Sequence, residues 1–357
     1  MWTLFITLYF LQDIGSTMIL SDLWEDDSDF IPFKAGGVGT GHSKSGTRKS
    51  WKKRFFFEQD LVARGLRILG KDRFQSKYAG CSQSDIDFFW EKIERHVIRP
   101  RESKIHARNK LLLWLDKVHN DLSWRQVSDS YQIGVATAIQ YVHNLLAGFI
   151  KAYKGTDVIS FPNAPQRMRM VSANKQRGKH MPHALYTMDG KHARCRGSTF
   201  PERMSPKYKG KHAYYNCLFL VERCFGTICA YNLDEASTKH DLDVLRESAW
   251  FQNLEQLADG WIIMCDKGYV GVEALNVAAT ARMNMGVRKQ YSPHFWRELQ
   301  LARGDSERIF SHFFVNKFKQ LSNWSGKGPK SFRDWALNVT CGIIVYNELK
   351  LRNAKPC

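Results

Sequence analysis

Residues 212–233 read HAYYNCLFLVERCFGTICAYNL, and this stretch decides the fold class. Apolar and aromatic residues run through both halves, as they do in strands that are largely buried. The two runs meet at Arg223 and Cys224. The pattern therefore predicts a hairpin made of strands 212–222 and 225–233.

Two further strands are predicted on either side of this hairpin. HALYTM at 183–188 is a short run that ends at Asp189, and GWIIMC at 260–265 is an uninterrupted apolar run that ends at Asp266. A run of the second kind is expected of a strand covered on both faces. Helices are predicted at 239–249, 294–302, 304–320 and 332–351. This order predicts an α/β domain over residues 181–352.

The residues before this domain differ from it in composition and in hydrophobic pattern. Residues 1–75 include the basic run RKSWKKR at 48–54 and are typical of a partly disordered leader. Residues 76–155 carry apolar side chains at helical spacing, which predicts an all-helical domain. Residues 156–180 form a basic connector. The recurring apolar positions are Ile86, Phe89, Trp90 and Ile93, and then Leu111, Leu112, Leu115 and Val118.

The helical domain contains a candidate helix-turn-helix, LSWRQVSDSYQIGVATAIQYVHNLL at 122–146. Ser123 is a plausible N-cap for its first helix, and the small residue Gly134 allows a tight turn before a second helix that begins at Val135. An αα-hairpin without any role in DNA binding is the alternative interpretation. The apolar contacts expected to hold the angle are Val127, Ile133, Val135 and Ile139. The residues expected to face DNA are Arg125, Ala136, Thr137, Gln140 and Tyr141.

Composition favours a polyanionic partner. Lysine and arginine outnumber aspartate and glutamate by 53 to 35, for a formal charge of +18, and the 43% hydrophobic share argues against disorder throughout. Eight cysteines without a CxxC pair fit a reducing compartment. The apolar opening MWTLFITLYFLQ is too short to span a bilayer, so no membrane partner is expected.

The two strand-end aspartates suggest metal-assisted phosphoryl chemistry. Mg²⁺, or Mn²⁺ in its place, is held by a few carboxylates on rigid elements, and two such ions assist in-line displacement at phosphorus. Asp189 and Asp266 with a helical glutamate would supply such a site. Between Gln166 and Lys211 there are 12 lysines and arginines against two acids, a surface suited to DNA phosphates.

Three motifs resemble those of the Harbinger and IS5-type DDE transposases. TMDGKHARCRGS at 187–198 is similar to the first-aspartate motif, IIMCDKGYVG at 262–271 to the second, and ARGDSERIF at 302–310 to the third. The resemblance implies an RNase H-like mixed sheet flanked by helices. It also implies two metal ions held by Asp189, Asp266 and Glu307.

The third motif departs from the family pattern in several places. Phe314 stands where a lysine is frequent, and Gln300 and Ser311 also differ from the frequent residues. These departures put auxiliary DNA contacts in doubt. Asp305 competes with Glu307 for the third ligand position, and Glu307 is favoured because Arg303 and Phe310 match the motif.

The function implied by the resemblance is cleavage and joining of DNA. Its DNA partners would be the transposon terminal repeats and the target DNA. The chain would form a homo-oligomer and could need a Myb-like accessory protein. It would be located in the nucleus of a eukaryote, or in the cytoplasm or nucleoid of a bacterium. A domesticated DNA-binding protein and an RNase H-like nuclease without strand transfer stay open as alternatives. The expected phosphate contacts are Lys191, His192, Lys267, Arg303 and Arg308.

Overall fold

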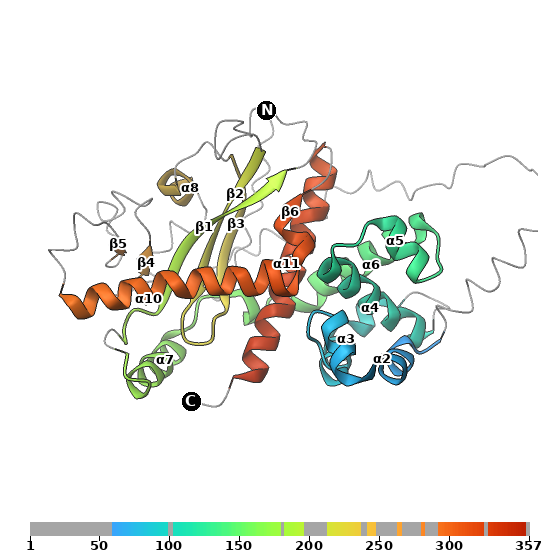
Figure 1. Ribbon diagram of the computed structural model, residues 1–357, viewed down its shortest axis with the longest axis horizontal. Helices are drawn as coiled ribbons and strands as arrows, with labels where there is room; N and C mark the ends of the chain where they lie inside the picture. Colours follow the sequence, from blue (N-terminus) through green and yellow to red (C-terminus); the bar gives the residue numbers. More distant parts are fainter. Residues whose placement is uncertain are drawn as a thin grey trace, which may run out of the picture. The chain divides into compact units, whose positions relative to one another are not determined.

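The computed structural model describes residues 59–98, 103–179, 182–195, 213–236, 241–247, 263–265, 280–282, 292–324 and 328–354. The described chain divides into two compact units. The helical unit contains residues 59–154 together with 317–320, and the sheet unit contains the remainder from residue 155 onward. Figure 1 labels the elements of both units.

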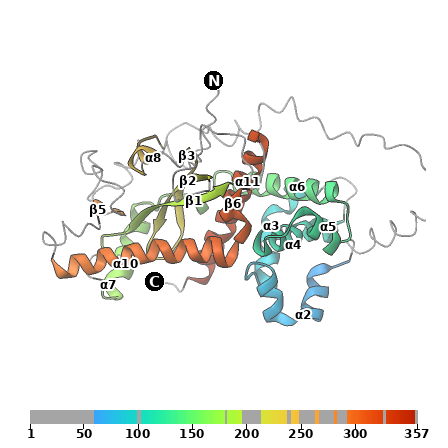
Figure 2. The same ribbon diagram turned by 45° about the horizontal axis from the view of Figure 1, so that its top comes forward.

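The helical unit contains five α-helices among the described residues (Figures 1 and 2). They are α2 (Leu61–Lys77), α3 (Gln83–Val97), α4 (Lys104–Asn120), α5 (Trp124–Ser130) and α6 (Val135–Tyr153). The apolar positions that predicted helices in the sequence are all buried, from Ile86 through Val118. Residues 317–320 pack on the same unit, where Phe318 stacks on Trp114 at a centroid distance of 6.3 Å.

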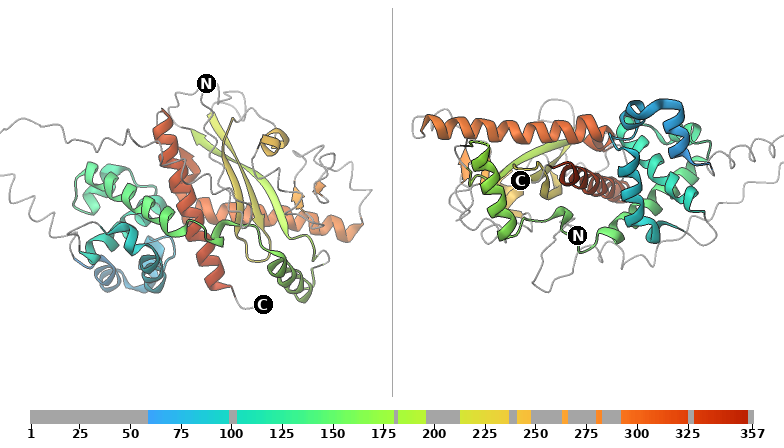
Figure 3. Two further views of the ribbon diagram at one scale, coloured as in Figure 1. Left: turned by 180° about the vertical axis from the view of Figure 1, so that it is seen from behind. Right: turned by 90° about the horizontal axis from the view of Figure 1, so that it is seen from below.

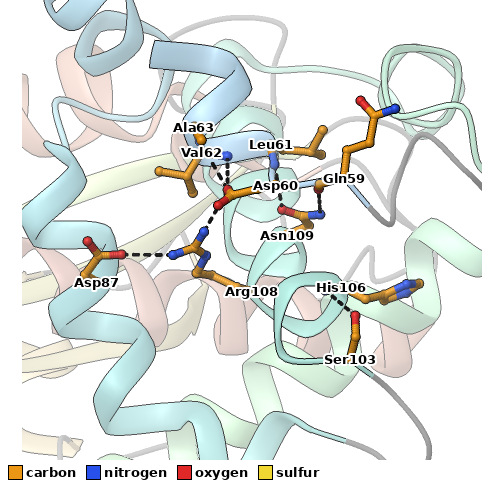
Figure 4. Close-up of polar contacts among 10 residues, drawn as sticks. All are labelled: Gln59, Asp60, Leu61, Val62, Ala63, Asp87, Ser103, His106, Arg108 and Asn109. Atoms are coloured by element: carbon orange, nitrogen blue, oxygen red, sulfur yellow. Dashed lines mark hydrogen bonds and ion pairs between the residues drawn. The ribbon is translucent and has the colours of Figure 1, made fainter. Parts of the chain in front are cut away.

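The start of α2 is fixed by polar contacts to α3 and α4, drawn in Figure 4. Asp60 caps α2 by accepting hydrogen bonds from the backbone of Val62 and Ala63. The Arg108 guanidinium pairs with Asp60 at 2.7 Å and with Asp87 at 3.2 Å. Because one arginine contacts carboxylates from two segments, it ties three helices together.

Helices α5 and α6 are bent by 96° at the break predicted near Gly134. Ser123 caps α5 as predicted, and Val127 is buried. Within the predicted break, from Gln132 to Gly134, the left-handed φ of 52° belongs to Gln132, and Gly134 has an ordinary φ of −71°. One detail of the prediction is wrong. Val135 is 41% exposed, because α6 turns Ala138 and not Val135 toward the core.

The helices in the described ranges differ from membrane-spanning helices in length or in apolarity. None of them, taken singly, has both the length and the apolarity needed to cross a bilayer. Helices α5 and α6 satisfy those criteria only as a bent pair.

The sheet unit is mixed α/β, with a sheet in the order β3-β2-β1-β4-β5. Strands β1 and β2 are antiparallel, as are β2 and β3, while β4 runs parallel to both β1 and β5. The short β6 pairs with the end of β1 in parallel. The strands are β1 (Tyr186–Cys195), β2 (Ala213–Glu222), β3 (Ile228–Ala236), β4 (Ile263–Cys265), β5 (Thr280–Arg282) and β6 (Asn323–Trp324).

The predicted hairpin is confirmed, with its turn at Arg223 and Cys224. The predicted end of the first strand is wrong, because β1 continues past Asp189 to Cys195. Strand β2 pairs with β1 over all ten residues, so its hydrogen bonds sustain the strand through the polar sequence. Pairing with β4 does stop at Met188, directly before Asp189.

Helices cover both faces of the sheet (Figure 3). Helices α7 (Ala164–Gln176) and α8 (Asp241–Glu247) share one apolar core with alternate residues of β1 and β2, such as Met188 and Leu220. The intervening residues, such as Phe219, meet α10 (Pro293–Phe310) and the π-helical segment Ser311–Lys317 that follows it. A predicted helix break at residue 303 is wrong, since α10 passes through it without interruption.

Helix α11 (Gly328–Asn353) closes this second face of the sheet. Its buried Asn347 accepts a hydrogen bond from the backbone N–H of Ile228 at 2.9 Å and donates to the Ile228 and Val158 carbonyls. The Tyr231 hydroxyl of β3 lies 2.7 Å from the hydroxyl of Thr340 in the same helix. Polar contacts therefore fix α11 on the edge strand of the hairpin.

Candidate functional site

Asp189 is the fourth residue of β1 and is half-buried. It lies opposite Phe219 of β2, and directly paired residues of an antiparallel sheet share a face. Its Oδ1 accepts the backbone N–H of Gly190 at 2.8 Å, and its Oδ2 lies 3.4 Å from the Ser306 hydroxyl of α10. The carboxylate is thus oriented from both sides on the face of the sheet that α10 covers.

Three consecutive residues of α10 take different roles near Asp189. Successive side chains of an α-helix point about 100° apart. Asp305 is held by Arg223 at 3.1 Å and also pairs with Arg308, while Ser306 is buried against Asp189. Glu307 is exposed. Asp305, the competitor for the third ligand position, is therefore engaged in ion pairs.

Aromatic packing fixes α10 on the sheet beside Asp189. The ring of Phe219 lies 5.4 Å from that of Phe310 and 5.7 Å from that of Phe314, measured between centroids. Phe314 is 3% exposed, so the residue that replaces the frequent lysine belongs to the core. Lys317, the nearest base after it, donates to the Ala79 carbonyl in the helical unit at 2.7 Å.

The remaining residues predicted for the acidic site are only partly described. Asp266 and Lys267 lie outside the described residues, as does the side chain of Arg303. Strand β4 ends in the register pair Met188 and Cys265, the residues that directly precede the two aspartates in the sequence. Within the ranges that the structure describes, no three His, Cys, Asp or Glu side chains form a group suited to a metal ion.

Lys191 and His192 follow Asp189 along β1, and both are half-buried. Successive residues of a strand alternate between the two faces of a sheet. Lys191 is therefore on the same face as Asp189, whereas His192 is on the face covered by α7 and α8. The strand thus separates two residues that were both predicted to contact phosphate, and only Lys191 shares the face of the carboxylate.

The residues predicted to face DNA in the helical unit have mixed exposure. Arg125, Ala136 and Gln140 are exposed, and Thr137 is half-buried. Tyr141 is half-buried and serves a structural contact, because its hydroxyl lies 2.8 Å from His106 Nε2 of α4. The Lys110 ammonium also lies 5.2 Å from the centroid of the Tyr141 ring. Of the five residues predicted to face DNA, Arg125, Ala136 and Gln140 are therefore the exposed ones.

In each unit, burial shifts the pKa of one ionisable side chain near a turn. Burial raises the pKa of Glu222 to about 7, although the backbone N–H groups of Phe225 and Cys224 lower it in part. Burial likewise lowers the pKa of Lys117 in α4 to about 8, against the opposing field of Asp121. Both groups hold chain turns in place and are remote in sequence from the three acid motifs.

Sequence reasoning missed Arg223 and Ser306, which contact the acidic segment. Arg223 was assigned only to a turn, and its partner Asp305 is 82 residues away. Ser306 lies 117 residues from Asp189 and matches no part of the motif. No local pattern marks either contact. No protein-family model, curated protein or solved structure matches this chain.

Proposed function

We propose that this chain is a DDE-type transposase that cleaves DNA strands and joins the freed 3′ ends to target DNA. The observation that carries the proposal is the contact between Ser306 and Asp189 at 3.4 Å. Two segments chosen from sequence as acid motifs, 117 residues apart, meet on one face of the sheet. This convergence is what a catalytic carboxylate site requires.

The strand order supports an RNase H-like interpretation of the sheet unit. Three antiparallel strands are followed by two strands parallel to β1, in the order β3-β2-β1-β4-β5. The first aspartate follows the last β1 residue that pairs with β4, and the second aspartate follows the last residue of β4. Helix α10, which carries the third acid, lies along β1 and β4. The proposed acids thus come from adjacent elements.

The donor set fits hard divalent cations, because Mg²⁺ and Mn²⁺ prefer carboxylate oxygens. Asp189, Asp266 and Glu307 would hold two such ions, which supply Lewis-acid stabilisation of the attacking and leaving oxygens when bound. The chain itself orients the Asp189 carboxylate through Gly190 N–H and the Ser306 hydroxyl. Lys191, on the same face, would bind a DNA phosphate electrostatically.

The helical unit would recognise the transposon ends. The bent pair α5–α6 presents Arg125, Ala136 and Gln140 to solvent, and a helix presented in this way can enter the major groove. Gln140 is the residue proposed to read a base, since glutamine can pair with adenine through two hydrogen bonds. Arg125 would contact the phosphate backbone. Tyr141 is left out of this surface because it packs against His106.

The decisive experiment incubates the full chain with DNA carrying its flanking inverted repeats, Mg²⁺ or Mn²⁺, and a supercoiled target plasmid. Joined products are expected and would establish strand transfer. Cleavage without joining would favour the nuclease, and sequence-selective binding without cleavage would favour the domesticated DNA-binding protein. The absence of both binding and cleavage would overturn the proposal.

A further inference from the structure

Arg223 is a buried arginine that contacts the helix carrying the proposed third acid. Its side chain is 1% exposed at the β2–β3 turn. Its Nε donates to Asp305 Oδ2 at 3.1 Å, and its Nη1 donates to the Ala184 carbonyl at 2.7 Å. Its backbone N–H donates to the Leu185 carbonyl at 2.8 Å. One buried residue therefore contacts two other segments of the sheet unit.

Those two segments carry the first and third proposed acids. Ala184 and Leu185 lead directly into β1, which contains Asp189, and Asp305 is in α10 two residues before Glu307. A guanidinium is planar, and its donors diverge at fixed angles, so two acceptors bound to it have a fixed separation. The Arg223 contacts thus fix where α10 lies along β1.

We propose that Arg223 is a positioning residue that sets the location of Glu307 relative to Asp189, with Asp305 as its partner and not as a metal ligand. The inference rests on the proposed metal site. Ser306 lies between Asp305 and Glu307 in the sequence and contacts Asp189, so a shift of the helix would change this contact as well. A buried cation with hydrogen-bonded acceptors on two segments resists such a shift more strongly than an exposed pair does.

The test compares Arg223→Lys and Arg223→Met with a matched control, Arg246→Lys. Arg246 belongs to an exposed pair with Asp243 in the same unit, at 3.6 Å. Lysine keeps the charge but lacks the planar fork, so it can hold one acceptor but not both. The measurements are Mn²⁺ affinity of the full chain by electron paramagnetic resonance, Mn²⁺-dependent DNA cleavage, and DNA affinity by fluorescence anisotropy.

Arg223→Lys is expected to raise the Kd for Mn²⁺ about tenfold, the usual range for residues that orient metal ligands. Cleavage should recover partly at high Mn²⁺, DNA affinity should stay unchanged, and Arg223→Met should be affected more than Arg223→Lys. A merely destabilised variant would also recover at high Mn²⁺ by mass action, so the Kd is measured on variants whose circular dichroism matches the wild type without metal. Asp305→Asn provides a second variant of the same contact should Arg223 variants fail to fold.

Measurements on the wild-type protein distinguish failure of the positioning role from failure of the proposed function. If it binds Mn²⁺ and Asp189→Asn does not, the proposed site stands, and a wild-type Kd in both Arg223→Lys and Asp305→Asn overturns the positioning role. If the wild type binds no Mn²⁺, the proposed function itself fails. The Arg246→Lys control should match the wild type in every measurement.

Discussion

Each unit of this protein has a buried charged side chain that holds a turn in place. The two charged side chains differ in how far along the sequence the residues that they contact lie. In the helical unit, Asp116 is 2% exposed and accepts hydrogen bonds from Tyr131 and Asn120, besides pairing with Lys77 at 3.2 Å. All these partners lie within 39 residues of Asp116. In the sheet unit, Arg223 reaches Asp305 across 82 residues.

This difference in sequence separation indicates different tasks. The short-range network around Asp116 fixes α2, α4 and the turn after α5 as a frame, while Arg125 and Gln140 stay exposed. The long-range contact of Arg223 joins segments that carry separate proposed acids. Damage to the first network is therefore expected to reduce stability, and damage to the second to alter a site as well. The following predictions test this contrast.

The largest effect is expected at the proposed acids. Asp189→Asn should reduce Mn²⁺-dependent cleavage by about 1000-fold, or about 4 kcal/mol in activation free energy, because the neutral amide is a poor ligand for a hard cation. Glu307→Gln should act in the same direction. DNA affinity, measured in parallel, should be spared.

Asp243→Asn is the matched control for these variants, since Asp243 is an exposed aspartate of α8. It should cleave like the wild type. Full cleavage by Asp189→Asn would show that Asp189 is not part of the site. It would also contradict the view that the Arg223 contact serves a catalytic site.

The next effect tests the frame of the helical unit. Asp116→Ala should lower the free energy of unfolding by about 2–3 kcal/mol, because it removes a buried acceptor of the Tyr131 hydroxyl and the charge partner of Lys77. Urea denaturation of the full chain, followed by circular dichroism, measures this. Asp129→Ala, an exposed aspartate of α5, should cost less than about 0.5 kcal/mol. Equal losses in both variants would contradict the role given to Asp116.

The pH dependence of stability should reveal the buried carboxyl beside the sheet turn. Burial raises the pKa of Glu222 from 4.5 to about 7, so the folded chain binds a proton that the unfolded chain releases between these values. Stability from this group is therefore full below pH 4.5 and is lost as pH rises through 7, by about 3 kcal/mol.

Glu222→Gln should remove that dependence. Unfolding by urea at pH 5 and pH 8 gives the wild-type change, and the same pair of measurements on the variant should show a smaller change. A variant with the same pH dependence as the wild type would assign the effect to other groups.

A smaller effect is expected where α6 is proposed to read DNA. Gln140→Ala should cost about 1–3 kcal/mol of discrimination between the terminal repeat and random DNA while leaving binding to random DNA nearly unchanged. Competition binding with both duplexes at fixed salt measures the ratio. An equal loss on both would make Gln140 a backbone contact.

The smallest effect concerns the turn between α5 and α6. Gln132 has a φ of 52°, a conformation that disfavours residues with a Cβ atom. Gln132→Gly should therefore stabilise the helical unit by about 1 kcal/mol, in thermal or urea unfolding. Gly134→Ala, at an ordinary φ, is the control and should give no such gain. A destabilised Gln132→Gly would show that the glutamine side chain has a role in the turn.

Local sequence patterns correctly predicted several secondary-structure elements of this protein. The hairpin turn at Arg223 and Cys224, the N-cap at Ser123 and the buried stripe from Ile86 to Ile93 all follow from residues close in sequence. These features depend on turn chemistry and on periodic burial, which a single sequence displays. The carboxylate candidates also came from sequence, through motifs beside strands.

Tertiary structure alone decided which of these residues meet. Strand β1 runs past Asp189 because β2 supplies hydrogen bonds to its end, and Val135 is exposed because α6 buries Ala138 instead. Asp305 pairs with Arg223, whereas Glu307, two residues later in α10, is exposed. Such pairings join residues far apart in the chain, and their energies depend on distance and burial, which no local pattern of residues contains.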